Sequence, residues 1–594
     1  MFTKILIANR GEIAVRVIRT AREMSIATVA VYSEADRDGM HVRMADEAYL
    51  IGPAAPSASY LNVDAILEVA QRSGAQAIHP GYGFLAENSA FARRVVAAGL
   101  VWIGPHADAI DAMGDKLRAR QAMAKADVPF VPGGTEAIDD VAAAREAAKS
   151  YGLPLALKAS GGGGGKGLKV ARTLDEIESA FTTAKREAEA YFKNGTIYAE
   201  RYLDNPKHIE LQILADKHGN VVHVGERDCS LQRRHQKLWE EAPANIPLKV
   251  RRAMREAGVR AAQAIAYDSV GTIECLVQGD DFFFLEMNTR IQVEHTVTEM
   301  ISGLDLIREQ IRVAAGEELG FGQDDIAFHG FAIEGRVNAE DPADNFRPAP
   351  GTISAYREPA GLGVRVDSAA YPGYTISPDY DSMIAKLIVW APTRAQAIAR
   401  LARAIDEYVI EGVPTTLPLL RALCDQPNVK DASYGTATLE HFAASGFAAS
   451  GFSVSPSASL SMVTLGSGGD TQPSAPQTIR IEVNDKLYNV RVFDLPERGV
   501  SPTRNGAQRV PPRVGGNQKS STSSGNDVVS PMHGVVVEMK VAPGDAIAEG
   551  QVVAIVEAMK MMNEIRAHKA GTASAVHAKA GDTVEARAAL VTIG

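Results

Sequence analysis

The sequence predicts a multidomain α/β protein that carries a small all-β domain near its C-terminus. Its 594 residues exceed the roughly 250 to 300 residues at which a single core stops growing. Apolar strand-like runs alternate with helical patterns over residues 1–115, whereas residues 527–594 alternate short valine-rich runs with Gly-Asp turns. We therefore expect three or four domains.

The first segment is typical of a doubly wound α/β unit. Residues 12–24 place Ile13, Val17, Ile18 and Ala21 at helical spacing, directly after a short apolar run. The expected strands cover residues 4–8, 28–32, 76–79 and 100–103. A dinucleotide-binding Rossmann domain is the alternative, but the first turn, Asn9-Arg10-Gly11-Glu12, lacks the G-x-G-x-x-G that lets a pyrophosphate approach closely.

Composition divides the rest of the chain. Helical and strand patterns continue without a low-complexity break over residues 116–445. Residues 446–477 and 496–526 are rich in Ser, Gly, Pro, Thr and Asn, so we interpret them as flexible linkers. Between them, alternating apolar residues on both sides of Asn484-Asp485 predict a hairpin within 478–494, which needs a docking surface because two strands alone are marginal.

Charge and cysteine content exclude several classes of protein. The net charge of −10 makes nonspecific nucleic-acid binding improbable. Three widely spaced cysteines, Cys229, Cys275 and Cys424, fit neither a disulfide framework nor a zinc site. No apolar run reaches the roughly 18 residues needed to span a bilayer, and no cleavable leader is recognisable. A cytoplasmic location and no membrane partner are expected.

A glycine run provides the first signal of chemistry. Residues 161–165 are five glycines whose backbone N–H groups could close over phosphates, and Lys158 and Lys166 flank them with positive charge. Ser160 and Gly167 stand where a P-loop would need a glycine and a hydroxyl, so the spacing excludes that motif. Taken alone, the run could equally be a flexible surface loop.

Three further clusters carry ligand or carrier chemistry. Glu274, Glu286 and Asn288 offer the oxygen ligands that Mg²⁺ accepts, although a solvated strand edge would look similar. Residues 226–237 are dense in donors for phosphate and bicarbonate oxygens, or form a solvated basic face. Lys560 lies between Met559 and Met561 at a turn between expected strands, an unusual setting for a merely solubilising lysine.

Together these clusters resemble the biotin carboxylase family of the ATP-grasp superfamily, fused to a biotinyl carrier domain. The resemblance covers residues 1 to about 445 and rests on six motifs: residues 7–14 (IANRGEIA), 79–85 (HPGYGFL), 113–116 (MGDK), 233–237 (RRHQK), 288–295 (NTRIQVEH) and 380–383 (YDSM). The overall architecture is similar to the α subunit of bacterial acetyl/propionyl-CoA carboxylases. One departure is Lys166, where many relatives have arginine; lysine keeps the charge and loses the bidentate fork.

The resemblance implies a Rossmann-like N-terminal domain (1–115), an ATP-grasp domain (116–330) with a lid at about 131–204, and an α+β C-terminal carboxylase domain (331–445). A biotinyl barrel-sandwich domain (527–594) would follow the linkers. It also implies the cofactors biotin, ATP and Mg²⁺ or Mn²⁺.

The implied site has five parts. Nucleotide would be held by Lys116, Lys158, Gly163, Gly164, Gly165, Lys166, Glu200, Leu203, His208, Gln232 and His235, and the metal by Glu274, Glu286 and Asn288. Bicarbonate would contact Lys237, Arg290, Gln292 and the Val293 backbone. The catalytic residues would be Glu294 as general base, Arg336 as oxyanion stabiliser, Lys237 and Arg290, and biotin would be attached to Lys560.

The implied function is ATP- and bicarbonate-dependent carboxylation of the attached biotin through carboxyphosphate, within an acetyl-CoA or propionyl-CoA carboxylase. Expected partners are a biotin protein ligase, further copies of this chain and a separate carboxyltransferase β subunit. The final acceptor stays open, with pyruvate, methylcrotonyl-CoA, urea and long-chain acyl-CoA as alternatives. Two rivals are a lipoyl swinging arm and another type of ATP-grasp ligase. The methionines beside Lys560 disfavour the lipoyl arm, and the other ATP-grasp ligases need no prosthetic lysine.

Overall fold

The computed structural model describes residues 1–160, 167–192, 194–234, 236–444, 477–483, 486–492, 526–530, 534–558, 561–584 and 587–594. Two units are distinguished: Met1–Phe452 with Gly525–Gly594, and Ser453–Ser524. The glycine residues Gly163, Gly164 and Gly165, and both expected linkers, lie outside the described residues apart from a few positions at their ends.

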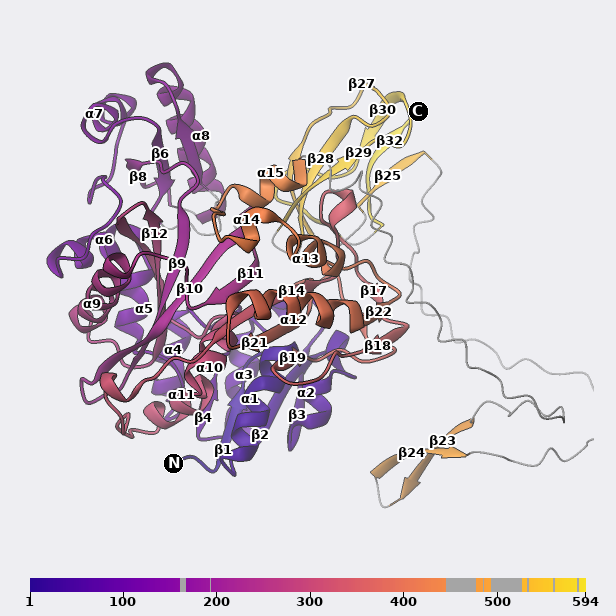
Figure 1. Cartoon of the computed structure of the whole chain (residues 1–594). Coiled ribbons are helices and arrows are strands. Elements are labelled where there is room, and N and C mark those ends of the chain that lie inside the picture. The colour runs from indigo at the N-terminus through magenta and orange to yellow at the C-terminus, as the bar shows by residue number, and fades with distance from the viewer. Residues whose placement is uncertain are drawn as a thin grey trace, which may run out of the picture. The chain divides into compact units, whose positions relative to one another are not determined.

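The N-terminal domain is built on a five-stranded parallel sheet in the order β3-β2-β1-β4-β5 (Figure 1). Its strands are β1 (Lys4–Ile7), β2 (Ala27–Ser33), β3 (Glu47–Gly52), β4 (Ala77–His79) and β5 (Val101–Trp102). Its helices are α1 (Gly11–Glu23), α2 (Met40–Met44), α3 (Val63–Ser73), α4 (Ser89–Ala97) and α5 (Ala107–Gly114). The expected strand, turn and helix at the start are confirmed; Gly11 takes a positive φ of 64° at that turn.

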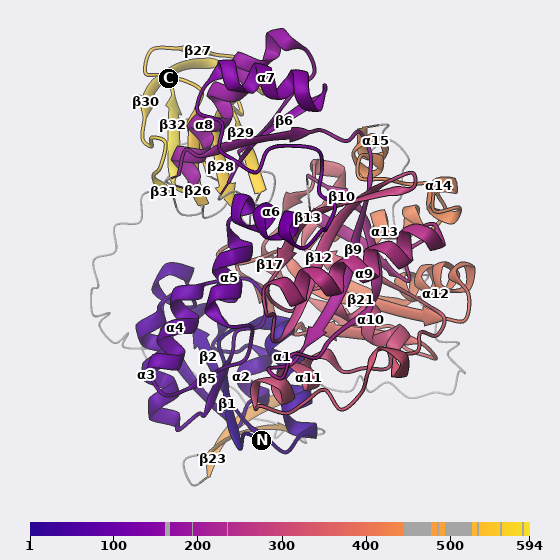
Figure 2. The same ribbon diagram turned by 90° about the vertical axis from the view of Figure 1, so that its left-hand side faces the viewer.

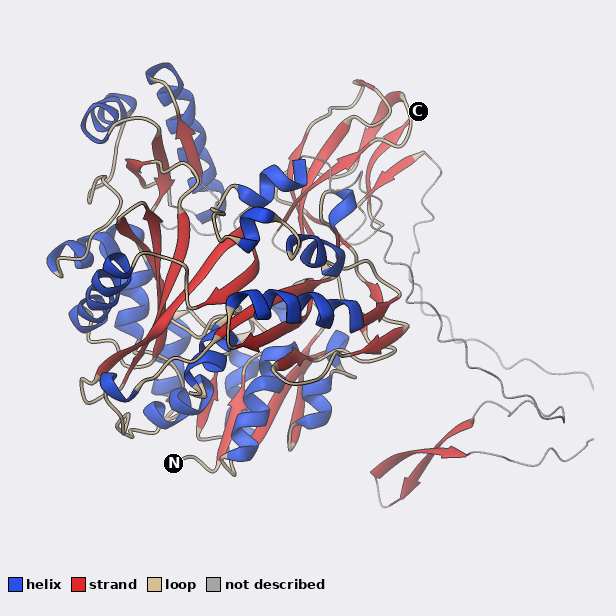
Figure 3. Ribbon diagram, in the orientation of Figure 1, coloured by secondary structure: helices blue, strands red, loops and turns tan. Residues whose placement is uncertain are grey.

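A sheet of eight strands, here called the central sheet, has the order β13-β12-β9-β10-β11-β14-β21-β19. Figure 3 draws strands in red and helices in blue. The strands of the central sheet are β9 (Lys207–Ala215), β10 (Val221–Arg233), β11 (Gln236–Ala242), β12 (Val270–Gln278), β13 (Asp281–Asn288), β14 (Phe331–Asn338), β19 (Val364–Ser368) and β21 (Met383–Ala391). All neighbouring strands pair antiparallel. The boundary expected at residue 331 therefore falls inside one continuous sheet, since β11 and β14 pair directly.

Helices cover both faces of this sheet. The side chains of α10 (His295–Ser302) pack on Ala242, Ala332 and Ile388, whereas α12 (Arg394–Glu407) packs on the alternate residues of β14 and β21, such as Ile333 and Leu387. The α9 helix (Leu248–Ala264) packs on β9 and β10. Further helices of this part are α6 (Lys116–Lys125), α11 (Leu306–Ala314), α13 (Leu417–Leu423), α14 (Pro427–Lys430) and α15 (Thr438–Ala444).

A bulge in β11 sets the direction of several functional side chains. Gln232 pairs with Lys237, but the preceding Leu231 pairs with Trp239, so β11 holds one extra residue, Leu238. Leu238 and Trp239 both lie in the core that α12 covers. An extra residue of this kind re-aims the side chains that flank it. Lys237 and Glu240 consequently share the opposite face, although they are three residues apart.

The expected lid contains a separate three-stranded sheet in the order β7-β6-β8, on which two helices pack side by side (Figure 2). Its elements are α7 (Val141–Tyr151), β6 (Leu155–Ala159), β7 (Leu168–Ala171), α8 (Ile177–Phe192) and β8 (Ile197–Arg201). Small and apolar side chains form its own core, among them Ala144, Leu155 and Phe181. The segment expected to be the lid thus has a hydrophobic core of its own.

The C-terminal segment folds into two four-stranded sheets, β25-β32-β30-β27 and β29-β28-β26-β31, as expected for a small all-β domain. Its strands are β25 (Asp527–Val529), β26 (Gly534–Met539), β27 (Ala546–Ile547), β28 (Val552–Ala558), β29 (Met561–Arg566), β30 (Gly571–Val576), β31 (Thr583–Val584) and β32 (Ala589–Ile593). The expected hairpin is also present, formed by β23 (Gln477–Val483) and β24 (Lys486–Val492). No helix of the described residues is long and apolar enough to cross a membrane.

Candidate active site

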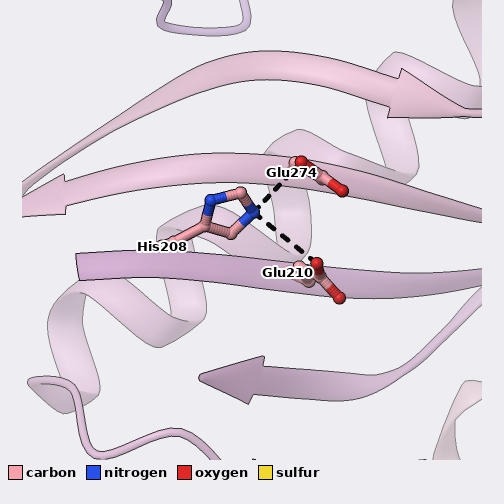
Figure 4. A group of neighbouring side chains, drawn as sticks. All are labelled: His208, Glu210 and Glu274. Carbon is pink, nitrogen blue, oxygen red and sulfur yellow. Dashed lines mark ion pairs between the residues drawn. The ribbon is translucent and has the colours of Figure 1, made fainter. Parts of the chain in front are cut away.

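Glu274, a buried carboxylate, lies among several charged side chains on one face of the central sheet. It projects from β12 next to His208 and Glu210 of β9, and Figure 4 shows the three side chains converging. The His208 Nε2 atom lies 3.0 Å from a Glu274 oxygen and 3.6 Å from a Glu210 oxygen. His208 and Glu210 share a face because strand side chains alternate, and Glu274 is the cross-strand partner of Glu210.

Lys237 joins this group to the expected catalytic base. Its Nζ lies 3.0 Å from a Glu274 oxygen and 2.9 Å from a Glu294 oxygen, and it also pairs with Glu210. The lysine comes from β11, and its three acidic partners come from β9, from β12 and from the residue directly before α10, so four parts of the chain meet at one ammonium group.

Arg336 of β14 contacts Glu294 from the other side. Its Nη2 atom lies 3.0 Å from the second Glu294 oxygen, while its Nε donates to Glu240 at 2.6 Å. Lys237, Glu294 and Arg336, which are scattered over the sequence, thus form one chain of ion pairs.

The residues that are expected to bind bicarbonate lie beside these ion pairs. Gln292 donates to Glu274 at 2.9 Å, and Arg290 donates to Asn288 at 2.8 Å and to Glu87 at 3.0 Å. The Val293 carbonyl accepts a hydrogen bond from Lys386 at 3.1 Å. Arg290 is therefore adjacent to the Glu294 group through its neighbours and makes no ion pair with Glu294 itself among the described contacts.

The residues expected at nucleotide form two groups. Lys158 pairs with Glu200 across β6 and β8 of the lid, and Arg120 holds the second Glu200 oxygen at 2.7 Å. Lys116 pairs with Glu286 of the central sheet. Leu203 and Gln232 are buried. Lys166, His235 and Lys560 lie outside the described residues, as do the three glycines of the loop.

The donor set fits a divalent metal. Glu286 is the cross-strand partner of Glu274, and Asn288 follows two positions later on the same strand, with its amide 2.8 Å from Glu274. Three oxygen-bearing side chains therefore lie on one face, and carboxylate and amide oxygens are the ligands that Mg²⁺ and Mn²⁺ accept. The negative charges of the two carboxylates are balanced by basic side chains in this structure: Glu286 pairs with Lys116, and Glu274 pairs with Lys237 and His208.

The surrounding charges hold the acids ionised. Burial acts to raise the pKa of Glu294, but Lys237 outweighs it, with help from Arg336, and brings that pKa below its ordinary value. Burial is likewise opposed at Glu274, whose pKa falls well below normal because Lys237 and His208 adjoin it. Glu274 and Glu210 raise the pKa of His208 to about 9, against the opposing effects of burial and Lys237. Glu294 is therefore available as a base at neutral pH.

Two central residues escape motif-based prediction. Glu210 contacts Lys237 and His208, and Arg227 donates to Glu210 at 3.0 Å and to Gln292 at 2.6 Å while fully buried. Polar residues at 208, 210 and 212 alternate with Ile209, Leu211 and Ile213, which is the signal that could have marked this face.

Family comparisons account for most of the chain. Residues 1–110 match the family model "Biotin carboxylase, N-terminal domain", and residues 334–441 match "Biotin carboxylase C-terminal domain". Residues 115–321 match "Carbamoyl-phosphate synthase L chain, ATP binding domain". The chain belongs to the biotin carboxylase family. Residues 526–593 match "Biotin-requiring enzyme", so this carboxylase also carries a biotinyl domain.

Individual relatives of the carboxylase differ in their named acceptors. A biotin-dependent acyl-coenzyme A carboxylase alpha3 subunit of Mycobacterium leprae is 43% identical over 98% of this chain and 97% of its own length. A pyruvate carboxylase subunit of Methanothermobacter thermautotrophicus is 53% identical over 71% of this chain and 86% of its own.

A solved structure supports the same assignment. The biotin carboxylase domain dimer of Hydrogenobacter thermophilus 2-oxoglutarate carboxylase, in complex with MgADP, ADP and bicarbonate, has 49% sequence identity and a TM-score of 0.72. It covers 74% of this chain and 98% of its own. These findings confirm the expected fold class, the ATP-dependent ligase activity class and the cofactor set of biotin and nucleotide with metal.

Proposed function

We propose that this carboxylase transfers the carboxyl group of bicarbonate to biotin on Lys560, at the expense of ATP, as the α subunit of an acyl-CoA carboxylase. The observation that carries the proposal is the position of Lys237. Its ammonium contacts both Glu274, a candidate metal ligand, and Glu294, the proposed general base. One cation thereby joins the place where phosphate charge would be neutralised to the place where bicarbonate would be deprotonated.

Glu294 acts as the general base. Its carboxylate takes the proton of bicarbonate, and the resulting oxygen nucleophile attacks the γ-phosphorus of ATP as the bond to ADP breaks. Lys237 and Gln292 hold the bicarbonate oxygens, because both project toward Glu274 beside Glu294. The carboxyphosphate so formed splits into CO₂ and phosphate. That phosphate can accept the proton from the biotin nitrogen, which then attacks the carbon of CO₂ to form carboxybiotin.

Arg336 supports the second half of the reaction. Its guanidinium adjoins Glu294 and can stabilise negative charge on the ureido oxygen of biotin when the nitrogen loses its proton. Such a nitrogen is a weak nucleophile, so stabilisation of this developing charge is where rate acceleration is required.

Nucleotide and metal would lie between the lid and the central sheet. Lys116, Lys158, Glu200, Leu203 and His208 would contact ATP, with Gly163, Gly164, Gly165, Lys166, Gln232 and His235 completing the set that the sequence suggests. Glu274, Glu286 and Asn288 would hold Mg²⁺ or Mn²⁺, which neutralises phosphate oxygens when bound. Closure of the lid would exclude water from the reacting phosphate.

The acyl-CoA acceptor is proposed because the Mycobacterium leprae acyl-CoA carboxylase subunit matches 98% of this chain, including the biotinyl domain. A pyruvate, methylcrotonyl-CoA, urea or long-chain acyl-CoA system is the alternative, since a pyruvate carboxylase subunit matches the carboxylase part at 53% identity. Partners would be a biotin protein ligase and a carboxyltransferase β subunit.

The test is to purify the chain together with its bound partner and supply ATP, Mg²⁺ and labelled bicarbonate with each candidate acceptor in turn. Label in propionyl-CoA or acetyl-CoA products supports the proposal. Label in oxaloacetate from pyruvate would replace it. Absence of label in biotin itself, with every acceptor omitted, would remove the carboxylase function.

A further inference from the structure

A pair of fully buried carboxyl groups lies behind Arg336, and the reaction scheme leaves it without a role. Glu240 of β11 and Glu334 of β14 are direct cross-strand partners, and each is 0% exposed. Partners of this kind have their Cβ atoms about 5 Å apart on one face of the sheet. Two buried acids side by side are costly unless they are paired or protonated, so a functional reason for them is worth seeking.

Both acids lie on the face that carries the site. Ala242 and Ala332 pack against α10. Each lies two residues from Glu240 or Glu334 on its strand, and therefore on the same face of the sheet. Arg336 follows Glu334 by two residues and shares that face. The α10 helix begins directly after Glu294, so Arg336, Glu294 and the two acids form one cluster.

Each acid makes one specific contact. Glu240 accepts from Arg336 Nε at 2.6 Å, and Glu334 accepts from the Thr296 hydroxyl in the first turn of α10. The remaining oxygen of each carboxyl has no hydrogen-bond partner among the described residues. The Glu240 carboxylate thus takes the Nε edge of the guanidinium and leaves an Nη atom to face Glu294.

We propose that Glu240 is a positioning residue for the carboxylation of biotin: its carboxylate orients Arg336 toward Glu294 and the reacting ureido group, with Glu334 beside it as its cross-strand partner. The inference rests on the proposed function, because it gives Arg336 its place in that reaction. It assigns Glu240 no contact with a substrate.

The surrounding charges make this arrangement dependent on pH. Burial, with the charge of Glu294, raises the pKa of Glu240 to about 7 against the opposing effects of Arg336 and Lys237. Burial raises the pKa of Glu334 well above its ordinary value, and Glu240 adds to the shift while Lys386 and Arg336 oppose it. Protonation of Glu240 below neutral pH removes the negative partner of Arg336.

The neighbouring residue supplies a matched control. Glu241 is also buried, 2% exposed, but it belongs to the opposite face, where Arg394 of α12 lies 3.0 Å away and Tyr434 donates to it at 2.7 Å. Glu241→Gln therefore removes a buried charge from the same strand without touching the Arg336 cluster. Glu240→Gln keeps an oxygen acceptor for Nε, whereas Glu240→Ala removes it.

The experiment uses the full chain with ATP, Mg²⁺, labelled bicarbonate and free biotin. We expect Glu240→Ala to lower kcat for biotin carboxylation by about 10-fold to 100-fold, the usual cost of a misplaced catalytic group, with KM for ATP within threefold. Glu240→Gln should fall between Ala and wild type, and Glu241→Gln should stay within threefold of wild type at temperatures where it is folded.

Two pH measurements separate positioning from simple structural damage. The wild-type rate should decline from pH 8 to pH 6 as Glu240 takes a proton, and Glu240→Gln should lack that decline. Independently of activity, the melting temperature of Glu240→Gln relative to wild type should increase from pH 5.5 to pH 8. The reason is that a raised carboxyl pKa costs stability as pH rises through it.

Wild-type kcat in Glu240→Ala would overturn the inference, as would superimposable pH profiles or equal losses in the Glu240 and Glu241 variants. A wild-type chain that carboxylates no biotin at all would instead remove the proposed function, and this inference with it.

Discussion

At the scale of single residues, Lys237 influences the charge of Glu294, the proposed general base. Its ammonium lies among Glu210, Glu274 and Glu294, and its pKa is raised well above normal because these three acids outweigh burial. Glu294 in turn has a lowered pKa because Lys237 and Arg336 adjoin it. The proton-accepting form of Glu294 therefore depends on a cation that is distant in sequence.

The first prediction concerns Glu294 itself. We expect Glu294→Gln to bind ATP within a few-fold of wild type and to lose bicarbonate-dependent ATP turnover by about 100-fold or more, the scale of a positioned general base. Nucleotide binding by calorimetry and phosphate release check the two parts. Glu309→Gln, which alters a buried acid of α11 that pairs with Arg312, is the control for folding. Unchanged turnover in Glu294→Gln would contradict the role.

The second prediction concerns pH. In Lys237→Gln the carboxylates of Glu210, Glu274 and Glu294 lose their shared cation, so the pKa of Glu294 should rise toward or above its ordinary value. A base must be deprotonated to act, and the acidic limb of the rate profile should therefore move to higher pH. Bicarbonate-dependent ATP turnover from pH 5 to pH 9 measures the limb. A limb at the wild-type position would argue that Lys237 does not tune Glu294.

At the scale of elements, buried histidine ties the stability of the N-terminal domain to pH. His41 of α2 is 1% exposed, and burial lowers its pKa to about 4, although Asp36 opposes the shift. The unfolded chain takes a proton near pH 6.5, whereas the folded chain takes none until about pH 4. Stability contributed by neutral His41 is therefore lost as pH falls through this window.

The third prediction follows from this shift. Between pH 7.5 and pH 5 the free energy of unfolding of wild type should fall by about 2 kcal/mol more than that of His41→Leu. Denaturant titration of the N-terminal transition at both pH values gives the difference. The exposed His218 offers a control, because His218→Gln should keep the wild-type dependence. Equal slopes for wild type and His41→Leu would refute the assignment.

At the scale of the whole molecule, Lys560, the proposed site of biotin attachment, and the candidate active site belong to different domains. Lys560 lies between β28 and β29, which pair antiparallel through Ala558 and Met561. The candidate site residues lie on the central sheet and in the segment that directly precedes α10. The proposed carboxylation of biotin on Lys560 would therefore involve two domains of one chain, and we expect the acceptor reaction to need a separate protein.

The fourth prediction concerns this division. The purified chain, given ATP, Mg²⁺ and labelled bicarbonate, should label its own biotin but no acetyl-CoA or propionyl-CoA. Lys560→Ala should lose the label and the streptavidin signal while still carboxylating free biotin. Labelled acyl-CoA without an added subunit would reveal a second catalytic domain in the chain. Streptavidin binding by Lys560→Ala would place biotin on another lysine.

The local sequence pattern was sufficient to predict several helices and strands and the types of residue that form the candidate site. The strands and helix at the start of the chain, the hairpin at 477–492 and the C-terminal β domain all follow from alternation and turn residues. Glu274, Glu286 and Asn288 could be grouped because strand alternation places the last two on one face. The motifs around Lys237, Glu294 and Lys560 gave the family.

Tertiary structure decided which of these residues meet. The extra residue Leu238 reverses the alternation of β11, so Lys237 and Glu240 share a face that a period of two would not give them. Arg336 reaches Glu294 because β11 and β14 pair across an expected domain boundary. Sequence by itself determined the chemistry available, since side-chain type and local period are local properties. Only long-range strand pairing determined the positions of Glu210, Arg227 and Glu240, because burial and charge balance depend on contacts between distant segments.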